Sequence, residues 1–286
     1  MERFKGIIIF LAMAICTSHV FAQTTPVTID FYSNGNKLNA EFYRVSEKTL
    51  HPTLILLHGY PGGEGDPLGL AGRLSAMGIN VFVFNYQGTW SSEGTFSFDS
   101  SMEDVGNAVS FLKESVTMEG FGIDTSNMVV AGYSFGGAMA LTEAIYNPEI
   151  NRVVSIGGAD EAVFGRKMLT DSSSRAFFES MLRDTQYPEG PVKFDLDEQM
   201  AYWFSNLDRY DLVKHAESLS NRDILLIGGW DDPSCIVEDF LIPLYRRLKE
   251  LGAPSIDIEV YQTDHSFRNV REEMSDRIFI WIMGMN

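Results

Sequence analysis

Six short apolar runs recur along the chain, and stretches with helical spacing separate most of them. The first five are almost continuously apolar, which is typical of strands buried on both faces of a parallel sheet. The sixth alternates apolar and charged residues, as a strand at a sheet edge does. The runs cover residues 53–57, 80–84, 128–131, 153–156, 224–227 and 256–260. Their alternation with helices predicts an α/β fold built on a mostly parallel, doubly wound sheet.

An antiparallel N-terminal hairpin is expected ahead of the parallel strands. Residues 28–32 and 41–45 alternate apolar and polar side chains on either side of the turn Ser33-Asn34-Gly35-Asn36, which is a hairpin pattern. Helices are expected over residues 68–77, 102–116, 138–146 and 243–251. The last two of these helices end at Asn147-Pro148 and at Gly252, which are ordinary stop signals.

Residues 159–221 interrupt this alternation, because they contain helical and loop patterns but no strand-like run. Eight aromatic side chains stand out there: Phe164, Phe177, Phe178, Tyr187, Tyr202, Trp203, Phe204 and Tyr210. Open α/β sheets bind ligands at the carboxyl ends of their strands, so we expect a helical lid insertion over about 159–221 that covers this edge. The alternative is a surface addition whose aromatic side chains only pack on the sheet.

The N-terminal segment has the pattern of a secretory signal peptide. Arg3 and Lys5 precede a short apolar run, and a sequence typical of a cleavage site ends at Ala22. We expect a signal peptide over 1–22, a single mature domain over 23–286, and export to the periplasm or the medium. The apolar run is shorter than the roughly 20 residues of a membrane span, so no stable membrane insertion of the mature chain is expected. An uncleaved N-terminal anchor is the alternative.

The charge balance excludes one class of partner. The 286 residues include 22 Lys and Arg against 39 Asp and Glu, a formal net charge of −17. Lys and Arg supply most of the affinity for nucleic acids, so no nucleic-acid partner is expected, and neutral or cationic ligands are favoured. Removal of the predicted signal peptide also removes Cys16 and leaves Cys235 alone, so the mature chain cannot form an internal disulfide.

A candidate nucleophile lies in the sequence Gly132-Tyr133-Ser134-Phe135-Gly136, which matches the pattern G-x-S-x-G. The match follows a predicted strand directly and leads into a predicted helix. A serine at such a strand-to-helix turn has its hydroxyl exposed above the sheet, and the flanking glycines allow the tight turn. We therefore expect Ser134 to be the nucleophile. The alternative is a serine that caps an ordinary helix.

A serine nucleophile requires a base, and His265 is the candidate. It follows the strand 256–260, in a loop before a predicted terminal helix, so it lies at the carboxyl end of the sheet. The other histidines are placed less well: His51 is expected in a loop ahead of a strand, His58 in a glycine-rich loop, and His215 on a helix surface.

An acid must orient the base, and two acids follow the strand 224–227. They lie in the turn Gly228-Gly229-Trp230-Asp231-Asp232-Pro233. Position alone leaves Asp231 and Asp232 both open, and Asp160, after the strand 153–156, is a third candidate.

The oxyanion of an acyl-transfer intermediate needs backbone N–H donors. The N–H of Phe135 follows the nucleophile directly. The loop His58-Gly59-Tyr60-Pro61-Gly62-Gly63 follows a buried strand, and its glycines allow close approach of a substrate. We expect Tyr60 to provide the second N–H, since Pro61 has none. The alternative is a plain turn.

These motifs, in this order over residues 53–283, resemble the α/β-hydrolase superfamily, which has the chain order Ser, Asp, His. The resemblance implies an α/β-hydrolase fold. Members commonly carry H-G-x-x-D-x after the seventh strand, and counting from Gly229 favours Asp232 over Asp231. Residues 85–94 resemble the N-Y-R-G-x-G-x-S-x-G stretch of the prolyl-oligopeptidase-like and dienelactone-hydrolase-like branches, with Gln87 in place of the arginine.

The function expected from these residues is ester hydrolysis by a serine hydrolase through an acyl-enzyme, with a small-molecule ester or short peptide as substrate. Ser134 also excludes the dehalogenase and epoxide-hydrolase branches, which need a carboxylate nucleophile. An amino- or dipeptidyl-type serine peptidase is the alternative; it would need carboxylates that hold the substrate's amino terminus, and acids such as Glu161 or Asp160 near the lid could do so. A catalytically silent binding protein of the same fold is the third hypothesis. We expect no metal and no cofactor.

Overall fold

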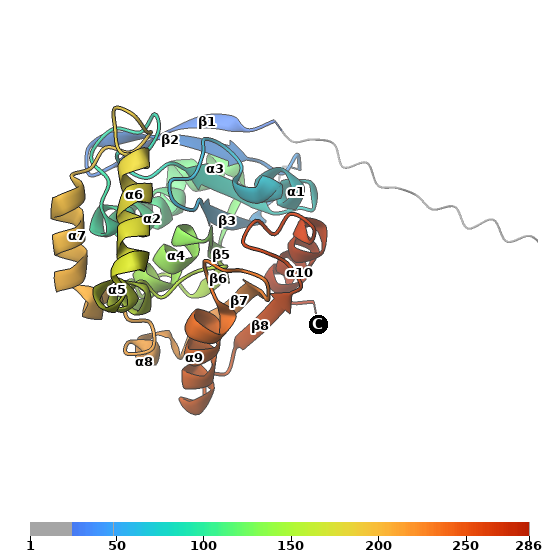
Figure 1. The fold of residues 1–286 in the computed structure, drawn as a ribbon. Coiled ribbons are helices and arrows are strands. Elements are labelled where there is room, and N and C mark those ends of the chain that lie inside the picture. Colours follow the sequence, from blue (N-terminus) through green and yellow to red (C-terminus); the bar gives the residue numbers. More distant parts are fainter. Residues whose placement is uncertain (1–24, 48, 286) are drawn as a thin grey trace, which may run out of the picture.

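An eight-stranded sheet forms the centre of the computed structural model, which describes residues 25–47 and 49–285 (Figure 1). Its strand order is β1-β2-β4-β3-β5-β6-β7-β8. The strands are β1 (Val27–Ser33), β2 (Asn36–Tyr43), β3 (His51–Leu57), β4 (Asn80–Phe84), β5 (Ile123–Tyr133), β6 (Arg152–Ile156), β7 (Asp223–Gly229) and β8 (Ile256–Tyr261). From β4 to β8 all neighbours are parallel, so the predicted doubly wound sheet is confirmed. The predicted signal peptide, 1–22, lies outside the described residues.

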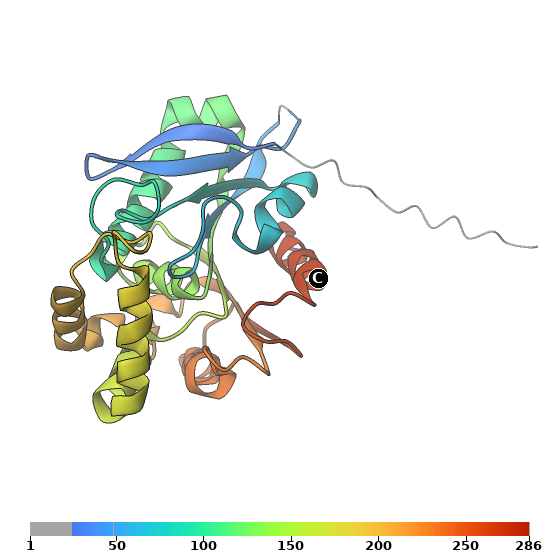
Figure 2. The same cartoon turned by 45° about the horizontal axis from the view of Figure 1, so that its top comes forward.

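The predicted N-terminal hairpin is also confirmed. Strand β1 pairs antiparallel with β2, and β2 pairs antiparallel with β4. Asn34 and Gly35 in the connecting turn have positive φ values of 50° and 82°, as a two-residue hairpin turn of matching twist requires. In both views the hairpin lies at one end of the molecule, with β7 and β8 at the other (Figures 1 and 2).

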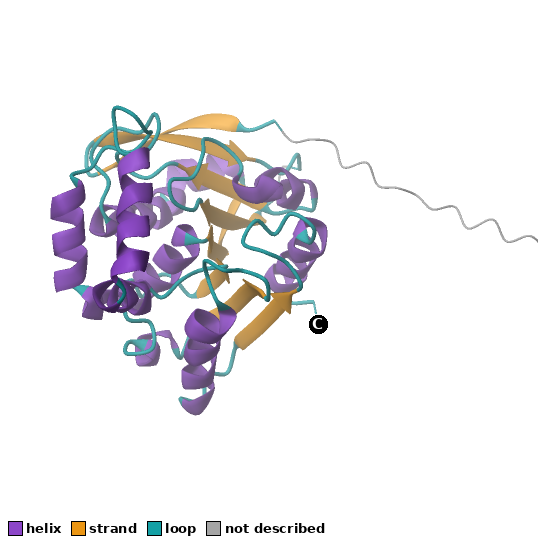
Figure 3. Ribbon diagram, in the orientation of Figure 1, coloured by secondary structure: helices purple, strands orange, loops and turns teal. Residues whose placement is uncertain are grey.

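Helices cover both faces of the sheet (Figure 3). Helices α1 (Leu70–Ala76) and α10 (Arg271–Met283) pack on one face, and α2 (Phe98–Lys113), α4 (Phe135–Tyr146) and α9 (Val237–Glu250) pack on the other. Successive residues of the inner strands therefore enter two separate cores, which explains their continuous apolar runs. No helix of residues 25–47 and 49–285 combines the length and the apolar character that crossing a membrane requires.

Helix starts differ from the sequence prediction. Helix α9 begins at Val237 rather than Pro243, which lies inside it, because one continuous apolar face from Val237 to Leu248 is buried. Helix α2 begins at Phe98, where Ser97 caps the N-terminus and forms a capping box with Ser100. A short helix, α3 (Ser115–Phe121), was not predicted.

The helical insertion, residues 159–221, connects β6 to β7 and leaves their pairing intact. Its helices are α5 (Glu161–Thr170), α6 (Ser172–Thr185), α7 (Leu196–Ser205) and α8 (Ala216–Leu219), and the short 3₁₀ helix η2 (Leu207–Tyr210) precedes α8. The other 3₁₀ helix, η1 (Pro67–Gly69), lies outside the insertion, directly before α1. Helices α5, α6 and α7 lie together beside the sheet (Figures 1 and 2). Within the insertion, Trp203 packs on Phe164 and Phe178. It also packs on Phe98 of α2, with 5.3 Å between the centroids of the Trp203 and Phe98 rings.

Candidate active site

Ser134 occupies a strained turn between β5 and α4. Its φ of 54° and ψ of −121° are unusual for a residue with a side chain. Neighbouring backbone leaves no room for side chains at the flanking glycines: a Cβ on Gly132 would lie 2.1 Å from the Gly136 carbonyl oxygen, and a Cβ on Gly136 would lie 2.7 Å from the His58 oxygen. Both glycines are therefore required for the turn that presents the Ser134 hydroxyl.

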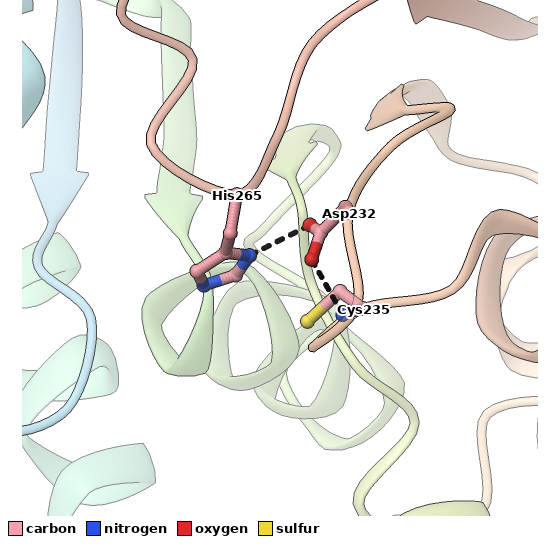
Figure 4. Close-up of side chains that lie close together, drawn as sticks. All are labelled: Asp232, Cys235 and His265. Atoms are coloured by element: carbon pink, nitrogen blue, oxygen red, sulfur yellow. Dashed lines mark hydrogen bonds and ion pairs between the residues drawn. The ribbon is translucent and has the colours of Figure 1, made fainter.

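His265 lies against this hydroxyl, in the loop between β8 and α10. Its Nε2 is 2.9 Å from Ser134 Oγ, and its Nδ1 is 2.6 Å from Asp232 Oδ2. Figure 4 shows the ring with Nδ1 directed at the carboxylate. The Tyr133 hydroxyl donates a hydrogen bond to the His265 carbonyl at 2.9 Å, which holds the loop over the turn. The structure thus brings the predicted Ser134, Asp232 and His265 together.

Asp232 is the acid in contact with the histidine. Its side chain is fully buried, and its Oδ1 accepts the N–H groups of Ser234 and Cys235 at 2.8 and 2.9 Å. Burial opposes ionisation, but the hydrogen bonds that the carboxylate accepts outweigh it and hold the pKa of Asp232 below its ordinary value. An ionised Asp232 keeps the proton of His265 on Nδ1, so Nε2 is free to accept the proton of Ser134.

The two competing acids have other contacts. Asp231 is exposed and accepts a hydrogen bond from Gln262 Nε2 at 2.6 Å. Asp160 caps the N-terminus of α5 through Ala162 and Val163, and its second oxygen accepts the Leu212 N–H. Neither carboxylate is hydrogen-bonded to His265.

The remaining described histidines do not reach Ser134. His51 is the first residue of β3, not a loop residue as expected, because β3 pairs with β5 from this position. His58 is buried, with Nδ1 2.6 Å from the Gly59 oxygen, and burial lowers its pKa to about 4. His215 is the N-cap residue that precedes α8, with Nε2 2.9 Å from the Asp208 oxygen.

Tyr60 and Phe135 lie beside the nucleophile. Phe135 is the first residue of α4, and the Tyr60 loop approaches so closely that a Cβ on Gly59 would lie 3.1 Å from Ser134 Cβ. Within the described residues, neither backbone N–H donates a hydrogen bond to another protein group. Both N–H groups therefore remain available to a substrate oxygen.

A cavity of about 430 Å³ opens beside Ser134 and His265. Its wall comes from the helical insertion and from segments outside it, among them the residues that follow β5 and β7. Most of its lining is aromatic or aliphatic, including Phe96, Phe98, Phe135, Phe164, Phe178 and Trp203. A second cavity of about 370 Å³ reaches Ser134 and His265 from the side of the Tyr60 loop. The aromatic content of the insertion was the sequence signal for this wall.

Sequence reasoning did not place Cys235 at the site. One potential ligand atom each of Asp232, Cys235 and His265 lies within 4.8 Å of the others (Figure 4). A metal ion there would compete with the hydrogen bond that orients His265 toward Ser134. Burial raises the pKa of the Cys235 thiol well above its ordinary value, so the thiol stays protonated and is a poor nucleophile.

The chain matches known proteins over much of its length. A family model described as the prolyl oligopeptidase family matches residues 73–284. The quorum-quenching protein AidA of Acinetobacter baumannii is 29% identical over 135 residues, which are 46% of this chain and 43% of that protein. The proline iminopeptidase of Saccharolobus solfataricus is 31% identical over 130 residues, 43% of this chain and 38% of that protein. The matched segments thus span less than half of either relative.

A solved structure has a similar fold over nearly the whole chain. It is the esterase Pf2001 of Pyrococcus furiosus, with a TM-score of 0.65 at 19% sequence identity, covering 91% of this chain and 93% of that one. The likeness at this identity concerns the fold, and the predicted α/β-hydrolase fold is confirmed.

Proposed function

Since the chain belongs to the prolyl oligopeptidase family, within the α/β-hydrolase superfamily, we propose that it is a serine hydrolase that cleaves an ester through an acyl-enzyme. The observation that carries the proposal is the continuous hydrogen-bond chain from Asp232 through His265 to Ser134, with distances of 2.6 and 2.9 Å. These are the contacts by which an acid orients a base and a base activates a hydroxyl.

Acylation begins when Ser134 Oγ attacks the carbonyl carbon of the ester and His265 Nε2 takes the hydroxyl proton. The buried Asp232 carboxylate stabilises the resulting imidazolium. The tetrahedral intermediate collapses, the C–O bond to the alcohol breaks, and His265 returns the proton to the leaving oxygen. A water molecule, deprotonated by His265, then attacks the acyl-enzyme and releases the acid and free Ser134.

The N–H groups of Tyr60 and Phe135 are proposed to stabilise the oxyanion. They lie on the two backbone segments that flank Ser134, and their hydrogen-bonding capacity is unused within the described residues. Donors fixed in advance by the backbone need no reorganisation as charge develops on the substrate oxygen, which is the source of their effect on rate.

The apolar lining of the 430 Å³ cavity supports the proposal that the substrate is an ester with an apolar or aromatic group. In this proposal the helical insertion acts as a lid and supplies one wall of the cavity. The segment 1–22 supports export of the enzyme, to the periplasm or the medium, with removal of a signal peptide.

A serine peptidase is the second candidate, because one relative is named a proline iminopeptidase and the matching family is named for an oligopeptidase. The same three residues would cleave an amide. A silent binding protein has less support, since neither the turn glycines nor any of the three side chains is missing.

A fluorophosphonate probe tests the hydrolase proposal. We expect covalent labelling of the wild type and none of Ser134→Ala, because the probe reacts only with an activated serine. A folded wild type that does not react would refute a serine hydrolase. Comparison of p-nitrophenyl esters of increasing acyl length with aminoacyl nitroanilides then separates esterase from peptidase: hydrolysis confined to the anilides would refute the ester assignment.

A further inference from the structure

The Glu161 carboxyl group lies in the cavity without a partner. Glu161 is the first residue of α5, is only 6% exposed, and lines the same cavity as Ser134 and His265. Within the described residues, no hydrogen bond or ion pair involves its side chain. Its neighbour Asp160 differs in this respect, since that carboxylate accepts three backbone N–H groups. Glu161 is therefore not needed to cap the helix.

No positively charged side chain among the described residues forms an ion pair with Glu161. Burial, with the charge of Asp160 added, raises the pKa of Glu161 to about 8, and Glu161 in turn raises the pKa of the Cys235 thiol. Lys167 is the one lysine or arginine among the described residues that lines this cavity. Its side chain is exposed and forms no ion pair with Glu161.

We propose that Glu161 determines specificity by pairing with a cationic nitrogen on the part of the substrate that fills the cavity; this inference rests on the proposed hydrolase function. An unpaired carboxyl group in an apolar cavity is costly, and a ligand cation removes that cost. The faces of the surrounding aromatic rings also attract cations. The net charge of −17 draws cations toward the protein as a whole. The substrate class is thus an ester with an otherwise apolar, positively charged group.

Matched ester pairs test this inference. One member of each pair carries a trimethylammonium group and the other a tert-butyl group of the same shape. In the first pair this group ends the acyl chain, and in the second it ends the alcohol. The enzyme variant is Glu161→Gln, which preserves shape. The control is Glu198→Gln, the same change at an exposed position of α7 outside the cavity lining.

We expect the wild type to prefer the cationic ester in at least one pair, and Glu161→Gln to lower the cationic-to-neutral ratio of kcat/KM about tenfold. Glu198→Gln should keep the wild-type ratio. A Glu161→Gln ratio equal to that of the wild type in both pairs would overturn the inference, even where both rates fall, because a structural role lowers both alike.

A binding measurement keeps this test independent of catalysis. Calorimetry measures the Kd of both ester pairs for Ser134→Ala, with and without the added Glu161→Gln change. The cationic-to-neutral preference is then expressed as a ratio of Kd values. Loss of the cationic preference on adding Glu161→Gln supports the inference even if the wild type hydrolyses no ester. An unchanged ratio of Kd values overturns it, whatever the fluorophosphonate probe reports.

Discussion

Asp232 illustrates how one residue's surroundings decide its chemistry. Two aspartates are adjacent in the turn after β7, and only the contacts differ. Asp231 is exposed to solvent, whereas Asp232 is buried, accepts two backbone N–H groups and faces His265. A carboxylate fixed in this way selects the tautomer of the imidazole as well as its orientation. The choice between the two acids depends on the loop that carries His265, which lies 33 residues after Asp232.

We predict that Asp232→Asn lowers kcat by about 10⁴-fold, because an amide does not hold the His265 proton on Nδ1. Asp231→Asn makes the same chemical change on the exposed neighbour and should leave kcat within about twofold of the wild type. Steady-state kinetics on a p-nitrophenyl ester measure both values. Equal losses in the two variants, or a larger loss in Asp231→Asn, would show that the acid is assigned wrongly.

At the scale of elements, the turn after β5 and the end of β3 are packed backbone against backbone. A Cβ on Gly136 would lie 2.7 Å from both the His58 and the Leu57 carbonyl oxygens. The nucleophile turn and the Tyr60 loop therefore have a fixed separation. This contact joins the proposed nucleophile to one of the proposed oxyanion donors without any side chain between them.

We predict that Gly136→Ala lowers the free energy of unfolding by about 1–3 kcal/mol, because backbone must move to admit the methyl group. It should also abolish fluorophosphonate labelling, since the separation of turn and loop changes. Gly120→Ala is the control: a Cβ there meets nothing within 4 Å, so stability should be equal or slightly higher. Denaturant titration measures the stability of both variants, and the fluorophosphonate probe measures their reactivity. A Gly136→Ala protein as stable and as reactive as the wild type would contradict the packing argument.

Some elements of the fold can be predicted from the sequence and others cannot. The buried strands were predictable because a strand between two cores must be apolar at every position. The start of α9 was not, because burial of a face from Val237 to Leu248 decided it against the signal from Pro243. Ser134 was predictable from its local turn. The aromatic residues of the insertion indicated one side of the cavity wall, but its full lining could not be predicted, because contacts between residues far apart in sequence, such as Phe98 and Trp203, create it.

The whole molecule carries a large excess of negative charge, and few of its carboxylates have a place in the proposed chemistry. A formal charge of −17 creates a field that extends about one Debye length, roughly 8 Å at physiological salt. Such a field disfavours anionic ligands before they reach the cavity. Selectivity by charge thus has a long-range component that no single residue supplies.

We predict that an ester ending in a carboxylate has a lower kcat/KM than the matching carboxamide, by about three- to tenfold at low ionic strength. Added salt screens the field, so the difference should shrink as ionic strength rises. Rates measured from 10 mM to 500 mM salt, with the neutral ester as the internal control, test this. A ratio that does not change with salt would mean that local contacts, rather than overall charge, cause the discrimination.

The position of the helical insertion between β6 and β7 makes the cavity wall separable from the sheet. These strands are direct neighbours, with Arg152 opposite Asp223 and Ile156 opposite Ile227, so the sheet is continuous from β6 to β7 without any contribution from the intervening helices. The helices that line one wall of the cavity and the strands that are followed by Ser134, Asp232 and His265 are therefore separate parts of the chain. We therefore expect that changes in the length or sequence of this segment can reshape the cavity without moving Ser134, Asp232 or His265.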